Sequence, residues 1–280
     1  MLYGLTIFPT EYSIQPARLA AEAESRGFES LWFAEHTHIP ACRSTPWPGG
    51  SELPKEYYDL YDPFIALTAA AAATERLKVG AGVCLVVQHD PIVLAKTVAT
   101  LDRISEGRLL LGVGGGWNAE EMANHGTDFK SRWKLLRERV EAMKAIWTRD
   151  KAEYHGELVD FGPIYSRPKP FTSPHPPIYI GGGAPWALGR AARYCDGWMP
   201  IGMRDEVIGH IPALHRAAEE AGREPGSLEV LVYGSPADGE LLERYRDAGV
   251  KSVIFWLPPA GEEEIKPLLD SYGELAERVG

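Results

Sequence analysis

The chain has 280 residues, of which 45% are hydrophobic and 24% are charged, a composition typical of a globular enzyme. Its net charge of -10 argues against binding to nucleic acid or to an anionic membrane surface. Three scattered cysteines argue against a disulfide framework and a structural zinc site. The sequence shows neither a membrane-spanning apolar run nor a secretory leader, so we expect a soluble cytoplasmic protein.

Short apolar runs alternate with amphipathic segments along the whole chain, which predicts a repeating order of strand and helix. Strands are predicted over residues 5–8, 30–34, 77–83, 108–113, 177–180, 197–201, 228–233 and 252–257. Helices are predicted over residues 17–26, after Asp62-Pro63, after Asp90-Pro91, from Pro185 onward, and over 133–147, 205–221, 238–248 and 262–278. Asp followed by Pro predicts a helix start, because Asp caps the helix and Pro suits its first position.

The alternation predicts an α/β fold with eight strands and eight helices, the order of a (β/α)8 TIM barrel, as a single domain over residues 1–280. A doubly wound open sheet with one extra unit is the alternative, and the unbroken rhythm favours the barrel. Two stretches interrupt the rhythm. Residues 36–61 form a long aromatic loop that either borders the substrate or packs on its own rings. Residues 148–176 contain a predicted hairpin about Gly156 and read as an insertion before strand five.

Two predicted strands end in glycine runs. Residues 109–113 lead into Gly114-Gly115-Gly116, and residues 178–180 lead into Gly181-Gly182-Gly183. Backbone without side chains lets a large group approach closely, so two such ends predict one extended ligand held at two points. The second run precedes a helix, where free N–H groups suit a phosphate. A tight turn or bulge is the alternative at the first run.

Two further strand ends carry candidate residues. Glu35-His36 closes strand two, and a histidine there either transfers protons or only hydrogen-bonds within the loop. No third ligand stands near His36 and His38, so no metal site is predicted. Residues 80–84 close strand three with small side chains that leave room for a flat ring, or that allow a close strand–helix contact. Cys84 has no adjacent base and is a weak candidate nucleophile.

Together these motifs resemble the bacterial luciferase-like barrel superfamily, and most closely its coenzyme F420-dependent oxidoreductases. The resemblance covers roughly residues 3–202. The matching stretches are residues 27–32 with Glu35-His36, Asp62-Pro63, residues 90–108, residues 112–117 with Glu120-Glu121, and residues 167–170, 176–182 and 195–200.

The resemblance implies a luciferase-like (β/α)8 barrel with a flavin or deazaflavin across its C-terminal mouth. It implies a non-proline cis peptide at Gly82–Val83 and a histidine, His36, that donates or accepts a proton as the catalytic residue. The residues implied to bind the cofactor are Glu35, His36, Ala81, Gly82, Val83, Cys84, Gly114, Gly115, Gly116, Trp117, Ile180, Gly181, Gly182 and Gly183.

The implied activity is hydride transfer between coenzyme F420 and a small organic substrate. One alternative is an FMN-dependent monooxygenase that receives reduced flavin from a partner reductase, and another is a flavin-binding barrel without turnover. Relatives that oxidise sugar phosphates carry a glutamate directly after the glycine run, where this chain has Trp117. After strand three, relatives often have Pro-x-Arg-Asn-Pro, where this chain has residues 87–91 without the arginine. Dimerisation is common in the family, so a homodimer is a further expectation.

Overall fold

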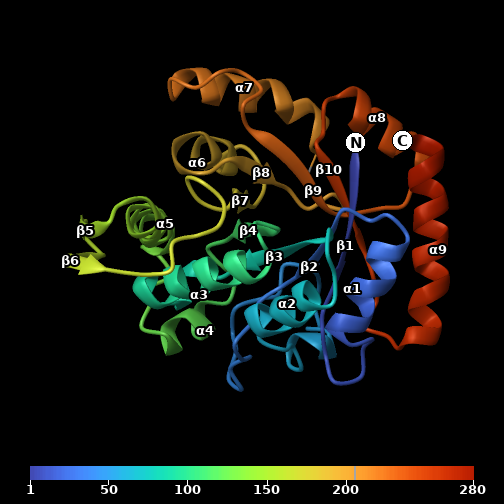
Figure 1. Cartoon of the computed structure of the whole chain (residues 1–280), viewed down its shortest axis with the longest axis horizontal. Coiled ribbons are helices and arrows are strands. Elements are labelled where there is room, and N and C mark those ends of the chain that lie inside the picture. The colour runs from blue at the N-terminus through green and yellow to red at the C-terminus, as the bar shows by residue number, and fades with distance from the viewer. Residues whose placement is uncertain (205) are drawn as a thin grey trace.

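The computed structural model describes residues 1–204 and 206–280. The barrel strands are β1 (Leu2–Ile7), β2 (Ser30–Phe33), β3 (Lys78–Cys84), β4 (Leu109–Val113), β7 (Ile178–Gly181), β8 (Gly197–Met199), β9 (Glu229–Ser235) and β10 (Ser252–Trp256). They close in the order β1-β10-β9-β8-β7-β4-β3-β2, with every neighbouring pair parallel (Figure 1). The predicted (β/α)8 barrel is therefore confirmed. The open sheet is excluded, because β1 pairs with both β2 and β10.

Helices surround this barrel on its outer side (Figure 1). They are α1 (Pro16–Ser25), α2 (Pro63–Ala72), α3 (Pro91–Ile104), α4 (Ala119–Asn124), α5 (Arg132–Thr148), α6 (Trp186–Tyr194), α7 (Ile211–Glu220), α8 (Gly239–Asp247) and α9 (Glu262–Val279). The helix predicted over 205–221 begins at a residue outside the described part, and the structure has a short 3-10 turn (Ile208–His210) before α7. The short helix α4 was not predicted.

The two Asp-Pro helix starts are confirmed. The Asp62 side chain caps α2 by accepting from Ile65 N at 2.9 Å. The Asp90 side chain caps α3 by accepting from the backbone N–H groups of Ile92 and Val93, each at 2.9 Å. Each carboxylate satisfies donors that the first helical turn leaves without a partner.

The insertion before the fifth barrel strand is a hairpin. Strands β5 (Lys151–His155) and β6 (Asp160–Tyr165) pair antiparallel as a separate two-stranded sheet. The hairpin projects beyond α5, away from the barrel (Figure 1). The prediction of a hairpin about Gly156 is confirmed.

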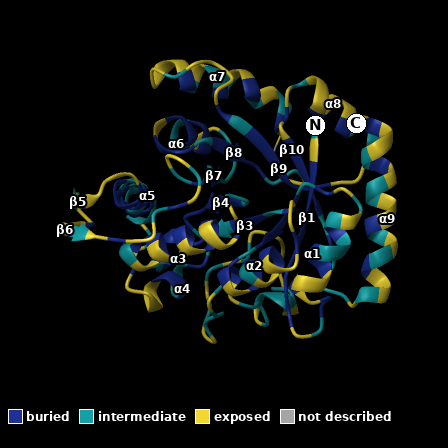
Figure 2. Cartoon of the chain, in the orientation of Figure 1, coloured by how far each residue is buried: buried dark blue, intermediate teal, exposed yellow. Residues whose placement is uncertain are grey.

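The hydrophobic core has two parts, one between strands and helices and one that faces the barrel interior. The interior part consists of Trp32, Leu110, Tyr179, Met199, Leu231, Tyr233 and Ile254. A Cβ on Gly80 would lie 2.3 Å from the Trp32 ring, so this glycine makes room for the largest interior side chain. Figure 2 shows buried residues along the strands and the inward helix faces, with exposed residues on the outer faces.

Within the described part of the chain, none of the helices has the length and apolarity that crossing a membrane requires.

Candidate functional site

The ends of β3, β4 and β7 meet around the side chain of Val83. A Cβ placed on Gly114 would lie 2.6 Å from Val83 Cγ2, and one placed on Gly181 would lie 2.8 Å from Val83 Cγ1. These distances are too short for any side chain, so both glycine runs approach one residue. The Gly82–Val83 peptide bond is cis, as the resemblance implies. The structure thus brings together strand ends that lie about thirty and a hundred residues apart in the sequence.

The loop after β7 presents free backbone donors at the start of α6. Gly182 has φ +131°, a conformation that favours glycine, and its carbonyl accepts from Trp198 Nε1 at 2.7 Å. Among the described residues, the N–H groups of Gly182, Gly183 and Ala184 find no acceptor. Unpaired donors beside a helix N-terminus form an anion receptor, so this loop fits the phosphate of a nucleotide-like cofactor.

His36 is held between a buried carboxylate and an indole. Its Nδ1 lies 2.7 Å from Glu121 Oε2, and Trp117 Nε1 donates to its Nε2 at 3.3 Å. Glu121 is fully buried, and its other oxygen accepts from Thr37 N at 3.2 Å. An indole N–H only donates, so Nε2 of His36 accepts from Trp117, and its Nδ1 carries the proton that Glu121 accepts.

The long loop 36–61 packs over this histidine. The Tyr57 ring lies 4.7 Å from Phe8, 5.3 Å from His36 and 6.5 Å from Trp117, measured between ring centroids. The Trp47 ring also packs on Tyr57, with the centroids 5.6 Å apart. The expectation that the loop packs on its own aromatic rings is therefore confirmed, and the rings also border His36. That the loop borders the substrate stays a prediction.

A second glutamate ties the loop to α4. Glu120 Oε1 accepts from the backbone N–H groups of Ser44 and Thr45 at 3.0 and 3.1 Å. Hydrogen bonds from Ser44 and Thr45 lower the pKa of this carboxyl to about 2. Adjacent glutamates thus hold two parts of one loop, Glu121 at Thr37 and Glu120 at residues 44–45.

Glu35 points away from His36 and into the loop after β3. One of its oxygens accepts from Leu85 N, and the other lies 2.7 Å from His89 Nε2. Cys84 is fully buried beside it, and burial, together with the Glu35 charge, raises the pKa of the thiol. Both oxygens of Glu35 are engaged by protein groups, so its contact with a cofactor, expected from the resemblance, stays a prediction.

Glu35, Cys84 and His89 have ligand atoms within 4.8 Å of one another, a grouping that could hold a metal ion. A zinc ion lies about 2.0–2.3 Å from each of its ligand atoms, which keeps those atoms more than about 3 Å apart. Glu35 Oε1 and His89 Nε2 are 2.7 Å apart, the spacing of a direct hydrogen bond. The geometry is that of a hydrogen-bonded clasp.

The remaining predicted residues lie around the same strand ends. Ala81, Gly114 and Ile180 are buried, and a Cβ placed on Gly115 would lie 3.1 Å from the Trp133 ring. Gly116 has φ +69° and turns the chain toward Trp117, which is half-buried. All of these predicted residues lie on, or directly after, β3, β4 and β7, the three strands whose ends meet at Val83.

Sequence reasoning missed Glu121 as a site residue, although it noted the Glu120-Glu121 pair. Asn118 caps α4 and accepts from Glu121 N at 3.3 Å, so an Asn with Glu three positions later marks this helix start. That spacing could have predicted α4. It could not have predicted that Glu121 reaches His36, 85 residues earlier.

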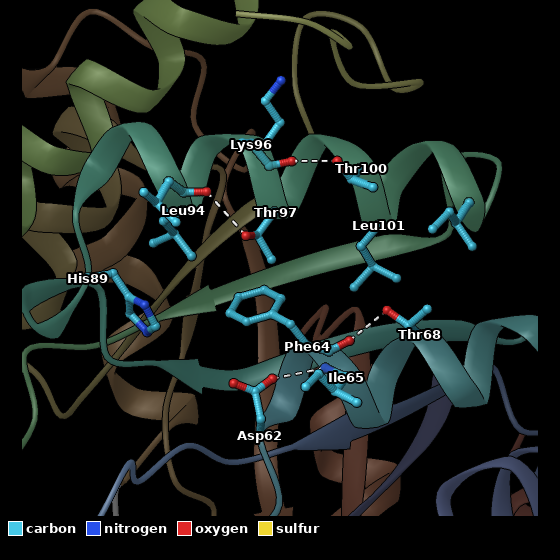
Figure 3. Close-up of a pocket in the computed structure, with 12 residues that line it drawn as sticks. Asp62, Phe64, Ile65, Thr68, His89, Leu94, Lys96, Thr97, Thr100 and Leu101 are labelled. Atoms are coloured by element: carbon cyan, nitrogen blue, oxygen red, sulfur yellow. Dashed lines mark hydrogen bonds between the residues drawn. The ribbon is translucent and has the colours of Figure 1, made fainter.

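A cavity of about 450 Å³ lies elsewhere, between α2 and α3 (Figure 3). Three threonine hydroxyls on its walls donate to carbonyls of their own helices, Thr68 to Phe64, Thr97 to Val93 and Thr100 to Lys96. None of the residues predicted to bind the cofactor lines it. Among the described residues, its wall reaches the candidate-site residues only through His89, the hydrogen-bond partner of Glu35.

Comparison with known proteins gives a family match over most of the chain. A family model described as luciferase-like monooxygenase matches residues 15–277. An uncharacterized protein of Mycobacterium tuberculosis is 38% identical over 268 residues, covering 94% of each chain. An F420-dependent glucose-6-phosphate dehydrogenase of Amycolatopsis mediterranei is 28% identical over 268 residues, covering 91% of this chain and 73% of that protein. The solved structure of an F420-dependent secondary alcohol dehydrogenase with an F420-acetone adduct superposes over 100% of both chains, with TM-score 0.78 and 18% identity.

Proposed function

This chain belongs to the luciferase-like monooxygenase family, and we propose that within it the protein is an oxidoreductase that uses coenzyme F420 to act on a small organic substrate. The observation that carries the proposal is the pairing of His36 with Glu121 beside Trp117, directly after the first glycine run. Relatives at about 28% identity bear the name of F420-dependent enzymes, which supports this cofactor over FMN.

The residues present fit such a cofactor. Gly182 and Gly183 offer free N–H groups for its phosphate, and Val83 with Gly114 offers a flat apolar surface of backbone and methyl groups for its ring. When bound, F420 supplies two-electron chemistry, the gain or loss of one hydride at its ring. The protein supplies position and proton transfer.

His36 is the proposed acid–base residue. With its proton on Nδ1 and Glu121 accepting it, Nε2 carries a lone pair that can accept the proton of a substrate hydroxyl. The reverse reaction returns that proton from Nε2 to a carbonyl oxygen. The 3.3 Å contact from Trp117 is long for a hydrogen bond, so a hydroxyl group can replace it.

The surroundings favour a small, weakly polar substrate. Tyr57 and Trp117 border His36 with aromatic rings, Phe8 packs behind Tyr57, and together they exclude water from the histidine. Trp117 takes the place of the glutamate found in sugar-phosphate oxidisers, so we propose an alcohol or carbonyl compound without a phosphate.

Titration of the purified protein with F420 and, separately, with FMN tests the cofactor. We expect saturable binding of F420 that is tighter than binding of FMN, measured by fluorescence. Gly183→Asp adds a negative charge at the phosphate loop and should weaken F420 binding by about tenfold or more, because like charges repel at close range. Gly183→Asn is the matched control of equal size and should keep most of the affinity.

Tight binding of FMN with oxygen consumption by its reduced form would instead support the monooxygenase alternative. Binding of either cofactor without redox exchange for any alcohol, aldehyde or ketone would support a barrel without turnover. Equal affinities for the Asp and Asn variants would remove the phosphate assignment.

A further inference from the structure

A group of arginines surrounds Trp133 at the start of α5. The Arg190 guanidinium lies 3.7 Å from the centroid of the Trp133 ring, and that of Arg132 lies 5.3 Å from it. The same indole contacts the Cβ position of Gly115, at the end of β4. Arg190 itself stands on α6, the helix that follows the 181–183 loop (Figure 1). The arginine group therefore adjoins the first glycine run through Trp133, and Arg190 lies on the helix that follows the second run.

These cations lack acidic partners. Throughout the described residues, no carboxylate lies within ion-pair distance of Arg132, Arg190 or Arg193. Arg132 donates from Nη1 to Phe129 O, and its buried Nε has no partner. Arg193 donates only to Gly189 O of its own helix. In a chain with 39 acidic and 29 basic residues, unpaired arginines gathered at one place indicate an anionic occupant.

Burial of the Arg132 and Arg190 guanidinium groups further favours a bound anion. Burial lowers the pKa of the Arg132 and Arg190 guanidinium groups, and the charge of Arg190 lowers that of Arg132 further. Each guanidinium thus faces both lost hydration and a like charge. An anion placed between them would relieve both costs.

A cavity of about 200 Å³ lies between α5 and α6 at this place. It is lined by Trp133, Lys134, Arg137, Arg190, Arg193 and Tyr194. Four of these six side chains are cationic and none is acidic. Lys134 pairs with Glu157 and Arg137 lies 3.8 Å from Glu141, so Arg190 and Arg193 hold the uncompensated charge.

We propose that this arginine cavity receives the carboxylates of the glutamate tail that extends beyond the phosphate of coenzyme F420. The inference rests on the proposed function, because it assumes that F420 is the cofactor. A phosphate at residues 182–184 would lie at the start of α6, and a chain leaving it along α6 reaches Arg190 within two turns. FMN ends at its phosphate, so the cavity would discriminate between the two cofactors.

The test compares F420 bearing its glutamates with the same coenzyme lacking them. Dissociation constants are measured by fluorescence at low and high salt for the wild-type protein, Arg190→Gln and the matched control Arg216→Gln. Arg216 is an exposed arginine on α7, outside the cavity. We expect the wild type to bind the tailed coenzyme about tenfold tighter at low salt, since a charge-assisted contact contributes on this scale.

Arg190→Gln should abolish the preference for the tail and its salt dependence, while the affinity for the tailless form stays unchanged. Arg216→Gln should keep the preference. Arg190→Lys retains the charge and should therefore keep part of the preference for the tailed coenzyme. Comparing it with Arg190→Gln separates loss of charge from loss of packing on Trp133.

Equal binding of the two coenzyme forms by the wild type would overturn this inference and leave the proposed function standing. Retention of the preference by Arg190→Gln would do the same. Failure of both forms to bind would overturn the proposed function, and this inference with it.

Discussion

His36 owes its orientation to Glu121 on α4 and to Trp117 just before that helix. Glu121 accepts from Nδ1 at 2.7 Å, and Trp117 donates to Nε2 at 3.3 Å. The same glutamate fixes Thr37 N, so the histidine backbone and ring are held together. A histidine oriented in this way presents Nε2 to a substrate while Nδ1 stays hydrogen-bonded to Glu121.

Glu121→Gln should disturb this orientation. A glutamine amide can donate to Nδ1 as well as accept from it, so we expect the proton to spread over both ring nitrogens. Nitrogen NMR shifts of His36 report that distribution, with assignment by a His36→Asn sample. Once a substrate is found, its kcat/KM should fall by about 10- to 100-fold, as for other residues that orient a reacting side chain.

Glu120→Gln is the matched control, because Glu120 contacts residues 44–45 and not His36. Its histidine shifts should equal those of the wild type. Identical shifts in the Glu121 and Glu120 variants would contradict the role given to Glu121.

Among the elements, the segment after β3 is held by a clasp between Glu35 and His89. Glu35 binds Leu85 N and His89 Nε2, and so spans the short turn between β3 and α3. Val83, near the end of β3, lies two residues before Leu85 and touches both glycine strand ends. The clasp thus supports the end of β3, which carries Val83.

The clasp predicts a pH-dependent stability. Burial lowers the pKa of His89, but the hydrogen bond and charge of Glu35 outweigh it, and the pKa is raised in the folded protein. A raised pKa contributes stability that is complete below the unfolded value of about 6.5 and disappears as pH rises through the folded value. His89→Gln should therefore cost about 2 kcal/mol of unfolding free energy at pH 6 and less at pH 9.

Urea unfolding of the wild type, His89→Gln, Glu35→Gln and the double variant, from pH 6 to pH 9, measures this effect. In the Glu35→Gln background the cost of His89→Gln should lose its pH dependence. A cost that stays constant with pH in the wild-type background would refute the clasp.

Across the molecule as a whole, closure of the barrel gathers the loops of eight strands at one mouth. β1 pairs with β10 on one side and β2 on the other, so residues from both ends of the chain complete the same sheet. Gly4 lies at this seam. A Cβ there would lie 2.4 Å from Ser30 Oγ and 3.1 Å from Ser30 O.

Gly4→Val should therefore destabilise the barrel by about 1–3 kcal/mol, the usual cost of adding atoms to a packed interior. Urea unfolding followed by tryptophan fluorescence and by circular dichroism gives the value. Gly162→Val on β6 is the control, because no atom lies within 4 Å of its Cβ position, and it should change stability by less than about 0.5 kcal/mol. Equal effects of the two substitutions would contradict the account of the seam.

The order of the elements and several of their boundaries follow from the amino-acid sequence without any tertiary information. Asp62-Pro63 and Asp90-Pro91 begin helices because a carboxylate caps nearby N–H groups, which is a local interaction. The strand ends at the glycine runs after β4 and β7, and the hairpin about Gly156, were likewise predicted from local sequence. Hydrophobic periodicity and turn chemistry act over a few residues, so both can be recognised in the sequence alone.

The contacts between strand ends, loops and helices that build the candidate site follow only from the folded barrel. Val83 touches Gly114 and Gly181 because β3, β4 and β7 are neighbours in the closed sheet. Glu121 reaches His36, and Arg190 stacks on Trp133, across helices that no local pattern relates. Such contacts depend on strand register and barrel closure, which are set by packing over the whole chain.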